Sequence, residues 1–476
     1  MNWILFLPEL YLFLMTAVFF ALSLSAGSRS RTNFLTALSM AAAGVIITLS
    51  TVGLQGTLFS GVYRADLFSQ VFKVLLMIGL FLVISLCSEL EGIRENRHPE
   101  FYLLLSVCTL GMMVLVSSVE LLTLYVSLEL TSYSLYILVA LRQGQGLERE
   151  AGIKYFLLGA STSAVMLFGL ACLYGASRTT DLAVLMRTLP AVINTPLAFT
   201  GFLLTLAGFF FKLALFPFHV WAPTVYQGAA NQVTTYIATA SKAAAIAVLI
   251  RLAALTGDAG LNLAYVLMAL SLLSMTLGNL VAIIQRDFKR LLAYSAIAHA
   301  GYVLIGILSM NESGYAGAIF YAAAYLVMNF TCFMVLTKVA QNGCDLNVAD
   351  LAGLHQRSPL LAMALMLGIF SLGGIPPTIG FTGKFMVFTA AMKKGYFFLV
   401  FLGMINVVIS LYYYAVVVKA AYLLKPEKEL PPIKLSMSTR CLTALLVIAI
   451  VGGGLFPGYL YELAFAATRV LLLPSP

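Results

Sequence analysis

The chain has 476 residues, of which 61% are apolar and 10% are charged, whereas about a quarter of the residues are charged in a soluble globular protein. This composition excludes a water-soluble fold, and at about 20 apolar residues per crossing it allows about 14 transmembrane helices. The net charge of +9 arises from 28 Lys and Arg against 19 Asp and Glu. In a membrane protein such an excess reports orientation in the bilayer rather than a nucleic-acid partner.

The six cysteines are scattered and form no CxxC pair. The sequence therefore signals no zinc site, iron-sulfur site or disulfide framework. We expect no cofactor or metal on this chain, so any associated redox chemistry is expected on another polypeptide.

In chain order, the hydrophobic spans are separated by Gly, Pro and clusters of charge. The first contains no basic segment and no small-residue cleavage site, which predicts an uncleaved helix rather than a signal peptide. We predict 14 helices, near 2–26, 34–55, 67–88, 101–118, 120–141, 151–176, 196–218, 231–254, 261–284, 289–309, 314–340, 359–391, 396–423 and 440–467. The fold class is all-α and polytopic, and 1–476 form a single membrane domain.

The basic residues orient this domain. With both termini on the outer side, 16 Lys and Arg fall in inner loops and 7 in outer loops, so the positive-inside rule favours that orientation. The remaining five lie inside apolar spans: Lys73, Lys154, Lys212, Lys242 and Lys384. A charge at mid-bilayer is costly, so each of these residues is a candidate for function.

Two of the five lie near the ends of their spans. Lys73 follows Asp66 by seven residues on one helical face, so it can snorkel or pair at the outer boundary. Lys154 follows Glu150 by four residues, the favourable order for a helical ion pair. The Glu150–Lys154 pair suits a structural role and proton uptake equally well.

Glu129 and Lys212 lie deeper. Glu129 is about nine residues into its span, so it must be protonated, paired or in a wet cavity. Lys212 precedes Pro217 by five residues, and a proline removes a backbone donor, so the seventh helix is expected to break there. Broken helices at membrane depth are tolerated only where they line protein or water, as in ion pathways.

Two further candidates lie in the middle of the chain. Lys242 shares a polar helical stripe with Thr235 and Thr239. His299 lies on one face with Ser295 and Tyr302. Haem ligation is a rival for an intramembrane histidine, but no second histidine occupies a matching face, so a proton relay fits better.

Lys384 follows the segment SLGGIPPTIGFTG, whose glycines and prolines predict an interrupted twelfth helix. Two broken helices, each with a deep lysine and five spans apart, are typical of inverted-repeat transport folds. We therefore predict helices 1–3 in 1–100, one five-helix repeat in 101–254, a second in 261–423, and a last helix in 440–467. The hypothesis is a row of coupled titrating groups that carries protons from Glu129 and Lys212 through Lys242 and His299 to Lys384.

Two rivals remain open. The first is a subunit of a sodium/proton antiporter or of a related ion-pumping hydrogenase complex, which uses the same charges with another ion. The second is a structural scaffold in which the charges only hold helices together. Five deep ionisable groups exceed what a scaffold needs.

Several segments carry a family resemblance over almost the whole chain: LPELYL, YVSLELTSYSLYILVA around Glu129, FKLALFPFHVWAPTVYQGA around Lys212, IQRDFKRLLAYSAIAHAGY around His299, and SLGGIPPTIGFTGKF around Lys384. The sequence resembles the antiporter-like membrane subunits of bacterial respiratory NADH:quinone oxidoreductase, complex I, and among them the N type. The resemblance implies 14 helices with an inverted repeat, a proton-loading pair at Glu129 and Lys212, relay roles for Lys242 and His299, and an outlet at Lys384. It also implies a non-redox, proton-translocating subunit of the bacterial inner membrane that contacts other membrane-arm subunits, including a neighbouring antiporter-like subunit. NADH, FMN, iron-sulfur clusters and quinone would bind other subunits.

Overall fold

The computed structural model describes residues 3–25, 30–143, 146–340, 343–426 and 431–472. In these ranges 13 helices are long and apolar enough to cross a membrane, and two shorter helices, Pro359–Gly373 and Ile379–Lys393, cover the predicted span near 359–391. The predicted all-α polytopic fold with about 14 crossings is confirmed. Arg29 and Lys428, which were counted among the inner-loop basic residues, lie outside the described residues.

The chain forms two compact units. Unit 1 comprises Met1–Leu213, Gly228–Val266 and Ala464–Pro476, and unit 2 comprises Ala214–Gln227 and Leu267–Leu463. The segment that follows Lys212 thus belongs to unit 2, although the helix that carries Lys212 belongs to unit 1.

Unit 1 is a helical bundle with one short hairpin. Its α-helices are α1 (Leu7–Ser23), α2 (Ser30–Ser50), α3 (Leu67–Ser85), α4 (His98–Ser117), α5 (Leu121–Ala140), α6 (Leu147–Ser177), α7 (Leu182–Val192), α8 (Pro196–Leu213), α10 (Asn231–Ala238) and α11 (Ala240–Ala254). Strands β1 (Gly56–Leu58) and β2 (Tyr63–Ala65) pair antiparallel, with Gly56 opposite Ala65. Helix α11 packs against α3, α4 and α8, and every residue of α11 is buried.

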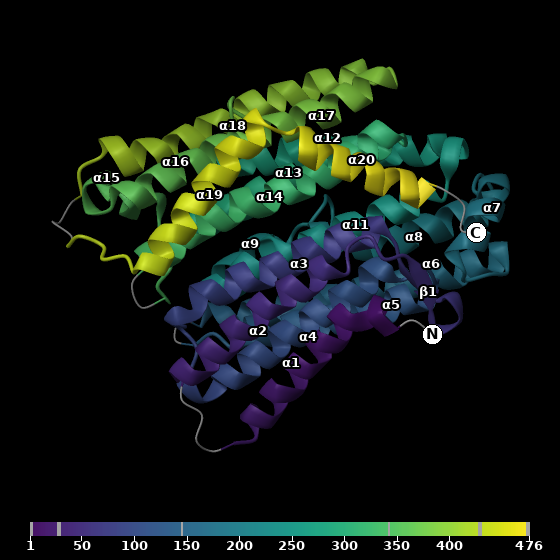
Figure 1. Cartoon of the computed structure of the whole chain (residues 1–476). Coiled ribbons are helices and arrows are strands. Elements are labelled where there is room, and N and C mark those ends of the chain that lie inside the picture. Colours follow the sequence, from purple (N-terminus) through teal and green to yellow (C-terminus); the bar gives the residue numbers. More distant parts are fainter. Residues whose placement is uncertain (1–2, 26–29, 144–145, 341–342, 427–430, 473–476) are drawn as a thin grey trace. The chain divides into compact units, whose positions relative to one another are not determined.

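In its described residues unit 2 contains helices joined by loops and turns, and no named strand. It contains most of α9 (Trp221–Gly228) and α12 (Leu261–Ala282), and the first part of α20 (Gly458–Leu472), whose remainder from Ala464 belongs to unit 1. Its other α-helices are α13 (Phe288–Leu308), α14 (Glu312–Val339), α15 (Leu354–Arg357), α16 (Pro359–Gly373), α17 (Ile379–Lys393), α18 (Phe397–Leu423) and α19 (Met437–Leu455). Helix α14 packs against α16, α17 and α19 (Figure 1). Short 3-10 helices add Trp3–Phe6, Phe59–Gly61, Leu86–Ser88, Glu95–Arg97 and Gly257–Gly260 in unit 1 and Val348–Leu351 in unit 2.

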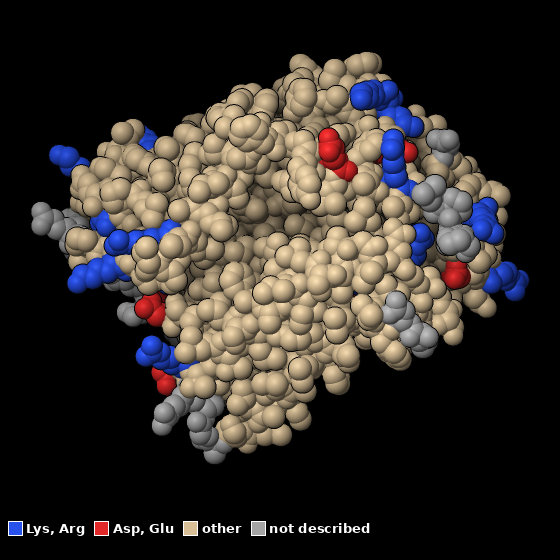
Figure 2. All heavy atoms as spheres, in the orientation of Figure 1, with Lys and Arg blue, Asp and Glu red and all other residues tan. Residues whose placement is uncertain are grey.

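Local sequence explains where several helices begin. Asp66 caps α3 through a capping box with Ser69, and Asp287 caps α13 by accepting from the backbone N–H of Arg290. Such caps satisfy amide groups that the first helical turn leaves unpaired. On the face in Figure 2, charged side chains lie toward two edges and the surface between them is uncharged, as expected of a surface that faces lipid.

The structure corrects three details. The predicted last helix, 440–467, is interrupted: α19 ends at Leu455 and α20 begins at Gly458, because Pro457 cannot supply the N–H that a continuous helix needs. Between the predicted helices near 151–176 and 196–218, where no helix was predicted, the chain forms α7, an amphipathic helix capped by Asp181. The eighth helix is divided at Thr239, whose φ of −114° and ψ of −83° are not helical.

Candidate functional site

The predicted break in the seventh helix is present. Helix α8 ends at Leu213, and Ala214 adopts a left-handed φ of 59°, which a non-glycine residue rarely adopts. Lys212 lies in the last turn of α8 and is only 4% exposed. Its ammonium makes no hydrogen bond within the described chain. An unpaired ammonium in such a place is costly, so it requires a water, an anionic partner or loss of its proton.

Glu129 lies on α5 and is half-buried. Its Oε1 accepts a hydrogen bond from the Ser163 hydroxyl of α6 at 2.5 Å. Among the described residues no ion pair joins Glu129 to Lys212. The structure therefore places both groups in unit 1 without bringing them into contact.

Lys242 is held at the end of the broken helix. Its ammonium, on α11, donates to the backbone carbonyl of Leu213 at 3.2 Å, and the residue is 2% exposed. The last carbonyls of a helix carry partial negative charge and have no partner within the helix, so they attract a cation. Lys242 was predicted to share a polar stripe with Thr235 and Thr239. The Thr239 hydroxyl of this stripe donates its hydrogen bond to the backbone carbonyl of Thr235.

The second break lies between α16 and α17, as predicted. Gly374 ends α16 with a left-handed φ of 80°, a conformation that glycine adopts at no steric cost. Lys384, on α17 and 4% exposed, donates to the carbonyls of Leu372 at 2.8 Å and Gly373 at 3.2 Å. Its ammonium also lies 4.7 Å from the centre of the Tyr302 ring, within the range of a cation–π contact.

The two breaks thus share one arrangement. In each, a buried lysine donates to the last carbonyls of the half-helix that ends at the break: Lys242 at α8 and Lys384 at α16. The negative end of a helix holds a cation without a formal counter-charge. A lysine held in this way can release its proton without leaving an unpaired carboxylate in the membrane.

His299 lies at the centre of a hydrogen-bonded cluster in unit 2. Its Nδ1 is 2.7 Å from the Tyr321 hydroxyl and its Nε2 is 3.1 Å from the Tyr414 hydroxyl. The Tyr414 hydroxyl is in turn 2.6 Å from the Ser295 hydroxyl. Both imidazole nitrogens therefore have partners that can donate or accept, which is the requirement for passing a proton across the ring.

A second polar chain in unit 2 leads toward the surface. The Asn279 amide donates to the Tyr302 hydroxyl at 3.3 Å and accepts from the Tyr413 hydroxyl at 2.9 Å. Tyr413 also lines a cavity of about 710 Å³ whose wall includes Arg286 and Lys419. Residues near Lys384 are therefore linked to a surface cavity by three hydrogen-bonding side chains.

The two lysines near span ends differ from each other. Lys73 is buried and pairs with Glu9 of α1 at 2.7 Å, so the predicted pairing is present, but its partner is Glu9 rather than Asp66, and the alternative of snorkelling is wrong. Hydrophobic packing of α3 leaves the Lys73 side chain inside the bundle. Lys154 pairs with Glu150 as the spacing predicted, and both side chains are about half exposed.

Sequence reasoning missed several members of these clusters, namely Glu9, Ser163, Asn279, Tyr321, Tyr413 and Tyr414. Glu9 carried a usable signal, since it is an acidic residue within the first apolar span. The tyrosines carried none, because aromatic residues are common in membrane helices. In the described chain no group of three or more His, Cys, Asp or Glu residues is placed to hold a metal ion.

Comparison with known proteins decides the family. Residues 118–410 match the transmembrane family described as NADH:quinone oxidoreductase/Mrp antiporter. The chain belongs to this family. A relative from Syntrophobacter fumaroxidans, named NADH-quinone oxidoreductase subunit N 2, is 58% identical over 99% of this chain and its whole length. A relative of the same name from Opitutus terrae is 41% identical over 96% of each chain.

Solved structures of the NADH:quinone oxidoreductase/Mrp antiporter family agree. A chain of respiratory complex I from Thermus thermophilus has a TM-score of 0.84 and 33% identity over 96% of this chain and 98% of its own. A chain of the Mrp complex from Dietzia has a TM-score of 0.88 and 18% identity over 100% of this chain and 98% of its own, which establishes the shared fold. Like other members, the chain is a multi-pass membrane protein.

Proposed function

We propose that this chain is a proton-translocating membrane subunit of an NADH:quinone oxidoreductase complex, with no redox site of its own. The relatives that carry the subunit N name support the assignment to the complex. We place NADH, FMN, iron-sulfur clusters and quinone on other subunits, and expect this chain to contact at least one further antiporter-like subunit. The membrane is then the bacterial inner membrane, with both termini on the outer side.

The observation that carries the proposal is the pair of broken helices with a lysine at each. Lys242 and Lys384 are buried, and the ammonium of each donates to carbonyls at the end of a half-helix. A group held by partial charges changes its protonation state when a nearby full charge moves. In the proposed mechanism, Glu129 approaches the unpaired ammonium of Lys212 and holds its proton, and retreat of Glu129 releases that proton toward Lys242.

In unit 2, His299 and its tyrosines receive and pass the proton and Lys384 is the outlet. The hydrogen bonds on both nitrogens of His299 support a relay, because an imidazole that takes a proton on one nitrogen can release one from the other. Glu150 and Lys154 are placed at an exposed surface of α6 and serve either as a surface pair or in proton uptake.

The test is proton pumping by the complex in sealed proteoliposomes, driven by NADH and followed with a pH-sensitive dye. Lys212→Ala and Glu129→Gln should each abolish most of the NADH-driven pH gradient, whereas Lys154→Ala should reduce it little if that residue is only a surface partner. Undiminished pumping by Lys212→Ala would overturn the proposal.

Sodium is the alternative ion, because a sodium/proton antiporter subunit could use the same buried charges, and the family description names an antiporter. A strict proton pump loses its gradient on addition of an uncoupler and is indifferent to a sodium gradient. Sodium uptake that persists with the uncoupler would favour the alternative.

A further inference from the structure

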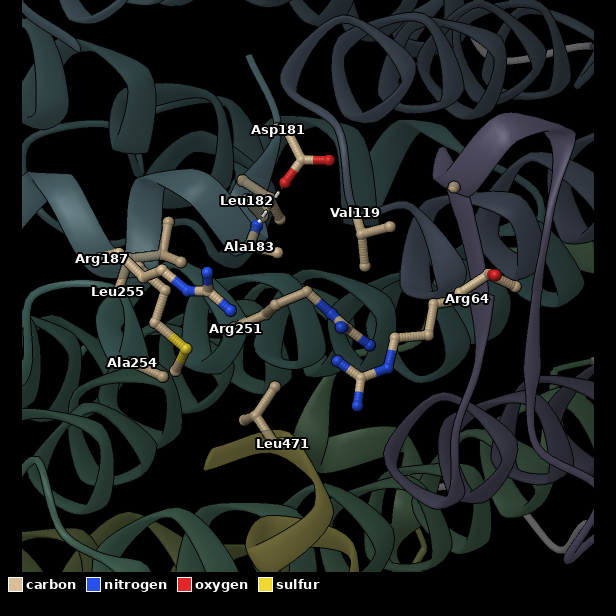
Figure 3. A pocket seen from close by; sticks show the side chains of 13 residues that line it. Arg64, Val119, Asp181, Leu182, Ala183, Arg187, Arg251, Ala254, Leu255 and Leu471 are labelled. Atoms are coloured by element: carbon tan, nitrogen blue, oxygen red, sulfur yellow. Dashed lines mark hydrogen bonds between the residues drawn. The ribbon is translucent and has the colours of Figure 1, made fainter. Parts of the chain in front are cut away.

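Unit 1 contains a cavity of about 290 Å³ that is lined by three arginines, Arg64, Arg187 and Arg251. Figure 3 shows their guanidinium groups directed into the cavity from different elements. Arg64 comes from β2, Arg187 from α7 and Arg251 from the last turn of α11. None of the three belongs to the proton path proposed above.

The cavity lies at the level where membrane spans end. Helix α3 begins at Leu67 directly after β2, α4 ends at Ser117, and α11 ends at Ala254. Val119, between α4 and α5, and Ala254 both line the cavity. A pocket at this level is at the depth of lipid head groups rather than of acyl chains.

The protein neutralises these arginines incompletely. Asp66 lies 3.4 Å from Arg64 and 3.4 Å from Arg251, and its carboxylate also accepts from the backbone N–H of Ser69 at 2.7 Å. One carboxylate is thus shared by two guanidinium groups and a helix cap. Arg187 makes no ion pair or side-chain hydrogen bond with any described residue, and its side chain is exposed.

Asp181, the acidic residue that lines the cavity, does not compensate for Arg187. The Asp181 carboxylate accepts from the backbone N–H groups of Ala183 at 2.7 Å and Val184 at 3.0 Å, which caps α7. Its charge is therefore directed at its own helix. Three positive groups face two partly engaged carboxylates, so the cavity has an excess of hydrogen-bond donors and of positive charge.

We propose that this cavity binds the phosphate group of an anionic phospholipid. Guanidinium groups bind phosphate oxygens through paired, charge-assisted hydrogen bonds. Much of the remaining wall is apolar and includes Leu182, Leu255 and Leu471, which suits a glycerol backbone and the start of an acyl chain better than a free inorganic ion. In this arrangement the arginines bind the phosphate, and the leucines contact the glycerol backbone and the start of an acyl chain.

The experiment is native mass spectrometry of the full-length chain in detergent, titrated with phosphatidylglycerol, with diacylglycerol and with inorganic phosphate. We expect retention of phosphatidylglycerol but not of diacylglycerol, which lacks the phosphate, and at most weak binding of inorganic phosphate. Arg187→Gln should weaken phosphatidylglycerol binding about tenfold, the effect of losing one charged hydrogen-bonding partner. Arg187→Lys, which keeps the charge, should retain much of the affinity.

The matched control is Arg178→Gln, an exposed arginine just before α7 that does not line the cavity. It should bind phosphatidylglycerol as the native chain does. Equal binding by Arg187→Gln and Arg178→Gln would overturn the proposal, and so would binding of diacylglycerol as tight as that of phosphatidylglycerol. Inorganic phosphate that displaces the lipid at equal concentration would overturn the lipid assignment and leave a site for a soluble anion.

Discussion

Gly374→Ala tests the role of the second helix break. Gly374 has a φ of 80°, and a Cβ added there would lie 3.0 Å from Cδ and 3.3 Å from Nζ of Lys384. A left-handed L-residue costs about 1–2 kcal/mol, and the added methyl group also forces the Lys384 side chain to shift, which we expect to weaken its hydrogen bonds to the carbonyls of Leu372 and Gly373. A hydrogen bond from a charged donor is worth about 1.5–3 kcal/mol, so losing one shifts the ammonium away from its site by roughly ten- to hundredfold.

Gly395→Ala is the control for this prediction. Gly395 follows the end of α17 with a φ of 84°, and nothing lies within 4 Å of its added Cβ. Both variants carry the same backbone strain, so both should lower the thermal unfolding midpoint similarly. Only Gly374→Ala should also lower the number of protons pumped per NADH in proteoliposomes. Equal pumping by the two variants would refute the assignment of Lys384 to the path.

Three other perturbations address separate features. Lys73→Ala leaves Glu9 buried without its 2.7 Å partner, so the free energy of unfolding should fall by about 3–5 kcal/mol in a chemical denaturation assay. Tyr321→Phe removes the hydroxyl 2.7 Å from Nδ1 of His299, a contact worth about 0.5–1.5 kcal/mol, so the pumping rate should fall by up to about tenfold with little loss of stability. Burial raises the pKa of Asp287, the backbone N–H of Arg290 and the charges of Lys289 and Arg290 oppose this shift, and the charge of Asp345 adds to it. The folded state therefore favours the protonated carboxyl, and the stability that this preference contributes is lost as the pH rises through the folded pKa. Asp287→Asn keeps the helix cap and should gain stability relative to the native chain as the pH of a thermal unfolding series rises.

Each of these has its control. Lys154→Ala breaks an exposed pair and should cost at most about 1 kcal/mol; a loss as large as that of Lys73→Ala would contradict the burial argument. Tyr412→Phe removes an exposed hydroxyl and should not slow pumping, so equal slowing by both tyrosine variants would remove His299 from the account. A constant stability difference between Asp287→Asn and the native chain across the pH series would show that Asp287 keeps its ordinary pKa.

The helices were predictable because a single physical requirement sets them. Only a helix satisfies its own backbone polar groups in lipid, so hydrophobic length fixes the span. Both helix breaks could also be predicted from the sequence, because Pro217 and the prolines of the Gly–Pro cluster around Pro376 lack the backbone N–H that a continuous helix needs. The division of the eighth helix at Thr239 could not be predicted from the sequence, because no proline or glycine lies there. Only the φ and ψ of Thr239 in the structure show it.

The partners of the candidate residues were the part that sequence reasoning could not supply. Local spacing correctly paired Glu150 with Lys154, because i,i+4 neighbours on a helix are fixed by helix geometry. Lys73 and Glu9 are 64 residues apart, and His299 meets Tyr414 across 115 residues. Such contacts depend on how helices pack, and no periodicity in one segment encodes the identity of a residue in another.

The central claim is that Lys212 and Lys384 serve one proton path. The most direct measurement is the number of protons pumped per NADH oxidised, in proteoliposomes that carry Lys212→Ala, Lys384→Ala or both substitutions. If the two lysines lie on one path, the double variant should lose no more pumping than the more severe single variant, because non-additive losses mark groups that act together. Losses that add in the double variant, or full pumping in either single variant, would contradict the claim.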